Sequence, residues 1–322
     1  MKQYSLFQPR AYLLALIAGS IAAAALVFLA LPGSAEQDGA RLYFNRDGKL
    51  TILQITDIHW KDGGPNDMKS LALIRKLVDG EKPDVVIFTG DLVYGKKCPR
   101  PKEGLDLITG VPIERNIPWS FTPGNHDGNG PLSKTEYVAY LMGKPLCLMN
   151  GARICPDGVS HCIPVHRRDG GSAAANIFLF DSTGTGKRAN YHMTADISPA
   201  QVAWYEKESG LNAVAFMHKP TAEFYDDGKY RTITGSLRVV LPYDTTESDL
   251  VRAFIRHKTM HAVFCGHLHV NDLLLDAGGV TLGFTRAAGY NAFGLPWVER
   301  GGRVVLLTGY GAGIETWQML DK

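Results

Sequence analysis

Two histidines at the end of an apolar run are the first residues that could do chemistry. In the stretch FCGHLHVND, His267 and His269 follow the run Ala262–Cys265. Residues two apart in an extended chain point to the same face, so both imidazoles could serve one metal site. A His-x-His pair is common by chance, however. The pair alone does not separate a metal ligand from a polar residue at a strand end.

Four other apolar runs end in polar residues of similar type: LTILQITDIH, DVVIFTGD, WSFTPGNHD and AVAFMHKP. Taken singly, each polar residue has an ordinary interpretation as a helix cap, a turn former or a loop residue. Taken together, they supply carboxylate, imidazole and amide groups, the mixture that divalent first-row metals accept. The residues concerned are Asp57, His59, Asp91, Asn125, His126, Asp127 and His218.

The elements that must position these residues alternate along the chain. The five apolar runs are nearly continuous in Val, Ile and Phe, which is typical of strands buried on both faces. Helical patterns lie between or beside them, at 67–80, 133–142, 198–208 and 247–257. This alternation predicts an α/β protein, and polar clusters at the carboxyl ends of strands are where open α/β sheets place their ligands.

The polar motifs at the ends of these five runs, in this order along the chain, resemble those of the calcineurin-like metallophosphoesterase family. They extend from Leu50 to His269. The tail AAGYNAFGLPW, followed by GGRVVLL, is similar to the purple-acid-phosphatase-like branch of plant and fungal proteins. The resemblance implies a four-layer α/β/β/α sandwich of two mixed sheets flanked by helices. It also implies a metal centre at the carboxyl ends of the strands.

The resemblance further implies two divalent metal ions, with zinc, manganese and iron all open. Asp91 would bridge them; Asp57, His59 and His269 would complete one ion, and Asn125, His218 and His267 the other. Two such ions clamp a phosphoryl group and activate a bridging hydroxide. By the same resemblance, His126 would stabilise the developing charge or protonate the leaving group. Asp127 would hold the other ring nitrogen of His126.

Tyr94 introduces a competing interpretation. The stretch Gly90-Asp91-Leu-Val-Tyr94 also matches true purple acid phosphatases, in which a tyrosinate binds ferric iron. Those enzymes usually lack a histidine in the first motif, whereas His59 is present here. An imidazole is already neutral near pH 7, while a phenol must lose a proton with a pKa of about 10. We therefore predict that His59 is a ligand and that Tyr94 forms part of the pocket wall.

The function predicted from these residues is metal-dependent hydrolysis of phosphate esters, with a phosphomonoesterase favoured. A phosphodiesterase or nucleotide-cleaving hydrolase of the same fold is the alternative. A non-catalytic, metal-stabilised binding module is an alternative of another class, but neither a ligand nor His126 is lost. Lys61, Arg167 and Arg168 either help to bind phosphate or are simply solvated. The net charge of +2 creates no field that would indicate nucleic acid as a partner.

The N-terminal sequence has the pattern of a targeting signal. Lys2 and Arg10 precede an apolar stretch at 11–31, and small residues follow at Gly33 and Ala35. This pattern predicts either a signal peptide at 1–35 or a signal anchor through 11–31. The catalytic domain would then be secreted or membrane-anchored outside the cytoplasm. We expect a linker at 36–48 and the catalytic domain at 49–320, with a cysteine-containing insertion near 144–172.

Export changes the interpretation of the cysteines. In an oxidising compartment, four cysteines in loop-like sequence predict two disulfides of undetermined pairing. A zinc site from Cys155, His161, Cys162 and His166 is the sharper alternative, but its spacing matches no common zinc module. The fifth, Cys265, lies in an apolar run and is expected to be a buried thiol. The four cysteines expected to pair are Cys98, Cys147, Cys155 and Cys162.

Overall fold

Alternate residues of the central strands pack into different hydrophobic cores. The computed structural model describes residues 41–169, 171–184, 193–225 and 228–321. In the strand at Val85–Thr89, Val86 and Phe88 join one core, whereas Val85 and Ile87 join another. Side chains alternate across a strand, so an unbroken apolar run fills both cores at once. The near-continuous apolar runs of the sequence therefore become the inner strands of a layered fold.

A five-stranded sheet carries three of the predicted strands. Its order is β14-β13-β2-β3-β4, with β2, β3 and β4 parallel and β13 antiparallel to both of its neighbours. The sheet is therefore mixed. Its strands are β2 (Leu50–Ile55), β3 (Val85–Thr89), β4 (Trp119–Thr122), β13 (Gly301–Thr308) and β14 (Gly313–Leu320).

A nine-stranded sheet carries the other two predicted strands, β8 and β10. Its order is β1-β6-β7-β8-β10-β12-β11-β9, with β5 paired to β6, and β7, β8, β10 and β12 run parallel. Its strands are β1 (Leu42–Tyr43), β5 (Arg153–Ile154), β6 (His161–His166), β7 (Ala173–Phe180), β8 (Asn212–Met217), β9 (Arg231–Thr234), β10 (Met260–Cys265), β11 (Leu274–Ala277) and β12 (Val280–Phe284).

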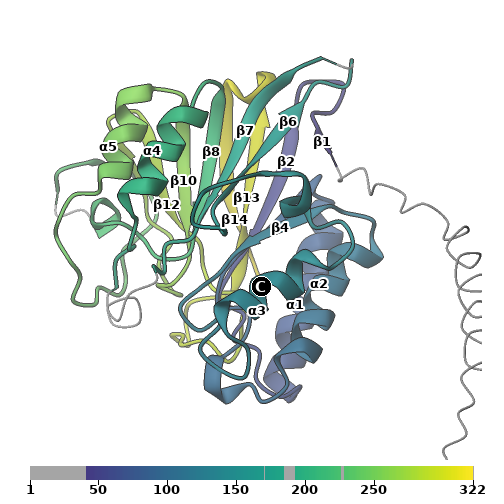
Figure 1. Ribbon diagram of the computed structural model, residues 1–322. Coiled ribbons are helices and arrows are strands. Elements are labelled where there is room, and N and C mark those ends of the chain that lie inside the picture. The colour runs from purple at the N-terminus through teal and green to yellow at the C-terminus, as the bar shows by residue number, and fades with distance from the viewer. Residues whose placement is uncertain (1–40, 170, 185–192, 226–227, 322) are drawn as a thin grey trace, which may run out of the picture. The chain divides into compact units, whose positions relative to one another are not determined.

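The two sheets pack face to face, and helices cover both outer faces (Figure 1). Side chains from both sheets form the middle core, among them Ile87 and Phe264. The predicted four-layer sandwich is confirmed. The helices are α1 (Pro65–Glu81), α2 (Pro101–Glu114), α3 (Lys134–Met142), α4 (Pro199–Glu208) and α5 (Asp249–His257). Short 3-10 helices lie at Gly95–Lys97, Leu148–Gly151, Ala222–Tyr225 and Gly309–Gly311.

Two parts of the expected domain plan differ from the structure. Part of the expected linker at 36–48 belongs to the fold, because Leu42–Tyr43 pairs in parallel with Val165–His166. The expected insertion near 144–172 contains β6, which is a member of the nine-stranded sheet. The signal or anchor segment at 1–35 lies outside the described residues. Among the helices that are described, none combines the length and apolar character needed to cross a membrane.

The two expected disulfides are absent, and all five cysteines are free, buried thiols. Cys98 and Cys147 pack in the core beneath α1 and α2, whereas Cys155 and Cys162 pack in the core beneath α4 and α5. The disulfide prediction was wrong: the sequence placed these four cysteines in loops of an oxidised domain, whereas the structure packs each into a hydrophobic core as a free thiol. Burial raises the pKa of the Cys162 thiol to about 12, so it behaves as a small core side chain.

Candidate metal centre

The candidate ligands sit in loops that follow the carboxyl ends of strands from both sheets. The loop after β2 is hydrogen-bonded to the loop after β3. The backbone N–H of Asp57 donates to Gly90 O at 3.0 Å, and that of His59 donates to Asp91 O at 2.9 Å. Similarly, the N–H of Gly266 after β10 donates to His218 O after β8 at 3.0 Å. Backbone pairing thus holds these loops against one another.

Four candidate ligands have a left-handed backbone, which non-glycine residues rarely adopt. The φ angles are 54° for Asp57, 52° for His59, 51° for Asp91 and 69° for His267. Such a conformation costs of order 1 kcal/mol or more per residue and persists only where the surroundings enforce it. Strain of this kind gathers at functional sites. At these four positions the left-handed backbone directs the side chains of successive strand ends toward one pocket.

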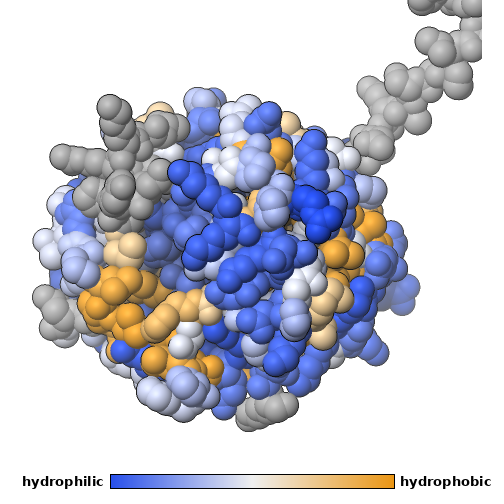
Figure 2. All heavy atoms as spheres, turned by 90° about the horizontal axis from the view of Figure 1, so that it is seen from below, coloured by the Kyte–Doolittle hydropathy of each residue, from blue (hydrophilic) through white to orange (hydrophobic). Residues whose placement is uncertain are grey.

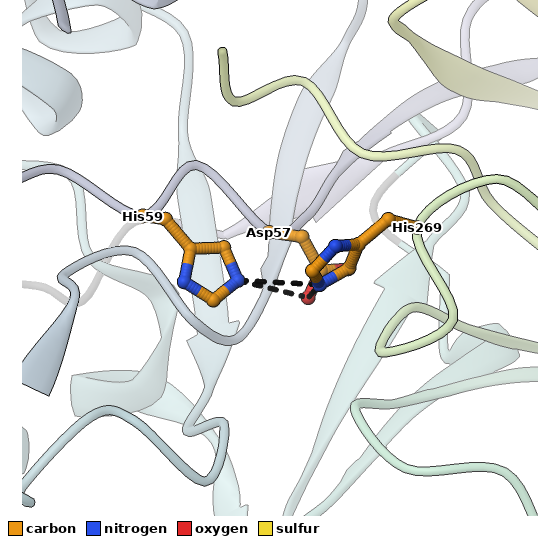
Figure 3. Close-up of side chains that lie close together, drawn as sticks. All are labelled: Asp57, His59 and His269. Carbon is orange, nitrogen blue, oxygen red and sulfur yellow. Dashed lines mark hydrogen bonds and ion pairs between the residues drawn. The ribbon is translucent and has the colours of Figure 1, made fainter. Parts of the chain in front are cut away.

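Asp57, His59 and His269 form the first group, and their side chains point toward one another (Figure 3). The Nε2 atoms of His59 and His269 are 3.3 Å apart. Asp57 Oδ1 lies 3.8 Å from the first nitrogen and 3.4 Å from the second. The other oxygen, Oδ2, accepts the backbone N–H of His267 at 2.8 Å. One oxygen of Asp57 is therefore held by the protein, and the other faces the imidazoles.

His218 is the centre of the second group. Its Nε2 lies 3.1 Å from Asn125 Oδ1, 3.3 Å from Asp91 Oδ2 and 3.3 Å from His267 Nδ1. Its other nitrogen, Nδ1, donates to Thr89 O at 2.9 Å. That bond leaves the lone pair of Nε2 to face the pocket whenever the ring is neutral.

Asp91 lies between the two groups. Its Oδ2 is 3.6 Å from His59 Nε2 and 3.3 Å from His218 Nε2. Its Oδ1 accepts the backbone N–H of His126 at 2.7 Å. The seven expected ligands are thus brought together. A third possible grouping joins His59, Asp91 and His126, so geometry alone leaves His126 open as a ligand.

Electrostatics in the pocket favour positive charge. Burial would raise the pKa of Asp57, but His269 and His59 outweigh it and hold the pKa well below its usual value. Burial would lower the pKa of His218, but Asp91 outweighs it and raises the pKa to about 9. For His267, burial prevails and holds the pKa well below its usual value. Ionised carboxylates beside a neutral imidazole are the donor set that a divalent cation requires.

The donor set fits metal ions on a second ground. Asp57 Oδ1, which faces the two imidazoles, is a buried atom without a hydrogen-bond partner. An unpartnered buried carboxylate oxygen costs free energy that a bound cation recovers. The Nε2 atoms of His59 and His269 add a second cost in free energy. They lie 3.3 Å apart, and their lone pairs repel each other unless a proton or a cation lies between them.

Asp127 has contacts that differ from the expectation. Its Oδ1 accepts the backbone N–H of Val93 at 3.1 Å, and its Oδ2 accepts that of Gly124 at 2.9 Å. The expected bond to the ring of His126 is not among its contacts. Asp127 therefore ties the loop after β3 to the loop after β4. Burial and the charge of Asp91 raise its pKa to about 7.

Tyr94 lines the pocket beside the first group. Its ring meets the ring of His59 edge-on, with centroids 4.7 Å apart, and the ring of His126 at 5.2 Å. Lys61 Nζ lies 5.1 Å from the centroid of the Tyr94 ring, which brings one expected phosphate-binding residue near the site. Arg167 instead stacks on the ring of Tyr310.

Sequence reasoning missed the groups that orient the ligands. His218 and His269 are oriented by the carbonyl oxygens of Thr89 and Phe293, and the hydroxyl of Thr56 donates to Asp57 Oδ2 at 2.9 Å. Any residue type supplies a carbonyl, so composition and spacing carry no signal for these contacts. Only Thr56 could have been identified from the sequence as an orienting group, because it directly precedes Asp57.

Gly266 has no room for a side chain, which gives a first prediction. A Cβ at this position would lie 2.0 Å from Thr56 Oγ1 and 2.6 Å from Asp57 Oδ2. We expect Gly266→Ala to lower the free energy of unfolding by about 1–3 kcal/mol, the usual cost of overpacking. Urea unfolding measures this. Gly210→Ala is the control, because a Cβ there meets nothing within 4 Å. Equal stability of both variants and the parent protein would contradict the packing described here.

The match to a known family covers most of the chain. The family described as calcineurin-like phosphoesterase matches residues 50–271. The chain belongs to this family. Among curated relatives, "Probable inactive purple acid phosphatase 14" of Arabidopsis thaliana is 26% identical over 95% of this chain and 90% of its own length. "Probable inactive purple acid phosphatase 28" of the same plant is 26% identical over 86% of this chain and 79% of its own length. The predicted resemblance to the purple-acid-phosphatase-like branch is confirmed.

Solved structures share the fold at low sequence identity. A dimetal phosphatase from Danio rerio superposes with a TM-score of 0.51 and 12% identity, over 84% of this chain and 98% of that one. GAP50, described as the anchor in the inner membrane complex of Plasmodium, superposes with a TM-score of 0.52 and 12% identity, over 84% of both chains. These likenesses support the fold and nothing finer.

Proposed function

We propose that the protein is a metal-dependent phosphomonoesterase with a dinuclear centre held by Asp57, His59, Asp91, Asn125, His218, His267 and His269. The observation that carries the proposal is the position of Asp91. One of its oxygens lies within 3.6 Å of an imidazole nitrogen in each of the two ligand groups. A carboxylate placed in this way suits two ions that share it.

Each part of the site then has a defined task. Two bound divalent ions would supply charge stabilisation for phosphoryl oxygens and an activated water. The chain holds the ligands in place through the carbonyls of Thr89 and Phe293, and Asp127 fixes the loop that carries Asn125 and His126. His126 stands at the pocket edge, where its imidazole can donate a proton to the leaving oxygen or stabilise charge on the phosphoryl group.

A non-catalytic role is the second candidate, and the names of the plant relatives favour it. Both of those quoted above are called "probable inactive". In this chain, however, every expected ligand and His126 is present. Retention of a complete donor set argues for turnover, although a metal-stabilised binding module would keep the ligands as well. A phosphodiesterase remains the alternative within hydrolases.

The deciding experiment combines metal analysis with hydrolysis by the same purified sample. We expect two metal ions per chain, hydrolysis of phosphate monoesters in preference to diesters, and loss of activity after chelation that added metal restores. Two bound ions without hydrolysis of either ester class would instead support the non-catalytic role. Preference for diesters would support the alternative hydrolase. Export stays a prediction, which N-terminal sequencing of protein from its native compartment tests.

His126→Ala separates a proton donor from a ligand. If His126 is a positioned acid, the variant keeps its metal ions and loses roughly 10²–10⁴-fold in kcat, the usual scale for such a group. The loss shrinks for nitrophenyl phosphate, because nitrophenolate leaves without protonation. Metal content and kcat on nitrophenyl and alkyl phosphates measure both effects. Loss of an ion would make His126 a ligand, and equal losses on both esters would leave charge stabilisation as its role.

A further inference from the structure

Two exposed aromatic residues lie on a loop fastened to the candidate metal centre. Phe293 is 58% exposed and Trp297 is 73% exposed. The carbonyl oxygen of Phe293 lies 3.1 Å from Nδ1 of His269, the ring nitrogen that faces away from the pocket. Large aromatic side chains this exposed are unusual on a protein surface, and they mark contact sites when they gather near a functional centre.

The loop that carries these aromatics is rigidly held. The guanidinium of Arg300 donates to Phe293 O at 3.0 Å and to Ala292 O at 2.7 Å. The N–H of Gly289 donates to Asp57 O at 3.1 Å, and a Cβ at Gly289 would lie 2.0 Å from Ile58 O. The loop is thus tied to Asp57 at Gly289 and to His269 at Phe293, and Arg300 braces it from within. Phe293 is therefore exposed at a fixed place beside the site.

A second segment brings further apolar side chains to the same ligand loop. The buried side chain of Asn271, two residues after His269, accepts the N–H of Arg238 and that of Val239, at 2.8 and 3.0 Å, and donates to Val239 O. The next two residues, Val240 and Leu241, are 53% and 41% exposed. We name Val240, Leu241, Phe293 and Trp297 the apolar rim.

The part of the site beside Tyr94 is cationic. Lys97 Nζ lies 4.5 Å and Lys61 Nζ 5.1 Å from the centroid of the Tyr94 ring. That ring in turn contacts His59 and His126. The surface view from below also shows hydrophobic side chains gathered to one side of a largely hydrophilic face (Figure 2). The lysines suit the anionic end of a ligand, and the apolar rim suits an apolar end of the same ligand.

We propose that the apolar rim makes this site selective for phosphate monoesters of apolar alcohols, with the alkyl or aryl group lying on Phe293 and its neighbours. Selectivity in binding rests on the rim, whereas turnover of such esters rests on the proposed function. Phe293 and Trp297 lie beyond the residues 50–271 that the family match covers, in the tail AAGYNAFGLPW that resembles the purple-acid-phosphatase-like branch.

Alkylphosphonates test the rim without any need for turnover, because their P–C bond is not hydrolysed. Calorimetry on the metal-loaded protein would give Kd for methyl-, propyl- and hexylphosphonate. Burial of a methylene is worth up to about fourfold in affinity, so we expect Kd to fall by at least about tenfold from methyl to hexyl. In Phe293→Ser this ratio should shrink. In the matched control Trp317→Ser, an exposed aromatic of β14 outside the rim, the ratio should match the parent protein.

The outcomes separate the rim from the catalytic proposal. Equal Kd across the series, no binding of any phosphonate, or an unchanged ratio in Phe293→Ser overturns the rim. Hydrolysis of methyl and hexyl phosphate is then measured on the same samples. Chain-length-dependent binding without hydrolysis overturns the proposed enzyme and supports the rim. Hydrolysis of both esters together with equal Kd across the phosphonate series supports the proposed enzyme and overturns the rim.

Discussion

Asp91→Asn is expected to abolish hydrolysis and to release both metal ions. The substitution keeps the shape of the side chain, and its amide oxygen can still accept the N–H of His126, as Asp91 Oδ1 does at 2.7 Å. What it removes is the negative charge at Oδ2, which faces His59 and His218. A neutral amide cannot balance two dications. Because the two-metal chemistry requires both ions, turnover should be lost with them.

Metal analysis and hydrolysis of nitrophenyl phosphate on the same preparation measure the two effects. Asp181→Asn is a control for the loss of a buried carboxylate, because Asp181 pairs with Lys134 at 2.6 Å and lies outside the ligand groups. That control should keep two ions even if it loses stability. An Asp91→Asn protein that retains two ions and normal rates would show that Asp91 does not bridge.

The apolar runs predicted an α/β protein with strands buried on both faces, whereas the four-layer arrangement followed from the family resemblance. Each inner strand needs apolar residues on both faces, and β-branched runs such as Val85–Phe88 between helical patterns are typical of such strands. The four predicted helices were also found, although α1 begins at Pro65 and α5 at Asp249 rather than at the expected residues. Helix ends depend on local capping contacts, which a periodic pattern does not reveal.

Helix α2 could not be predicted, and its sequence shows why. It contains Gly104, Gly110 and Pro112, residues that disfavour helices. Gly104 is nonetheless required, because a Cβ there would lie 2.3 Å from Trp60 Cδ1. A tertiary contact thus outweighs local propensity. The cysteines were misjudged for a related reason, since burial of Cys155 and Cys162 depends on strand pairing that the sequence alone did not reveal.

The candidate site was predictable by residue type but not by its supporting contacts. Carboxylates and imidazoles at five strand ends point to a metal centre wherever they are found together. The carbonyls of Thr89 and Phe293 and the backbone contacts of Asp127 depend on loop geometry. The partners of Asp127 differ from those expected for the same reason, because both of its carboxylate oxygens accept backbone N–H groups.

His59→Ala is expected to be severe and Tyr94→Phe mild. The ring of His59 is buried, and its Nε2 lies 3.6 Å from Asp91 Oδ2 and 3.3 Å from His269 Nε2. Loss of this ligand should cost more than the roughly 10–100-fold that loss of even an outer-shell partner of a metal costs. Phenylalanine at position 94 keeps the edge-on contact with His59 and loses one hydroxyl, worth about 1 kcal/mol, or about fivefold in rate.

The visible spectrum decides between these two residues independently of any rate. A tyrosinate bound to ferric iron absorbs visible light through charge transfer from ligand to metal, whereas imidazole and carboxylate ligands on zinc or manganese give no band of comparable strength. The rings of Tyr94 and His59 form a T-shaped pair, and Lys97 lies over the face of Tyr94, an arrangement that suits a wall residue. We therefore expect the isolated protein to be colourless. A strong visible band that vanishes in Tyr94→Phe would instead make Tyr94 a ligand and place the protein among the iron-dependent purple enzymes.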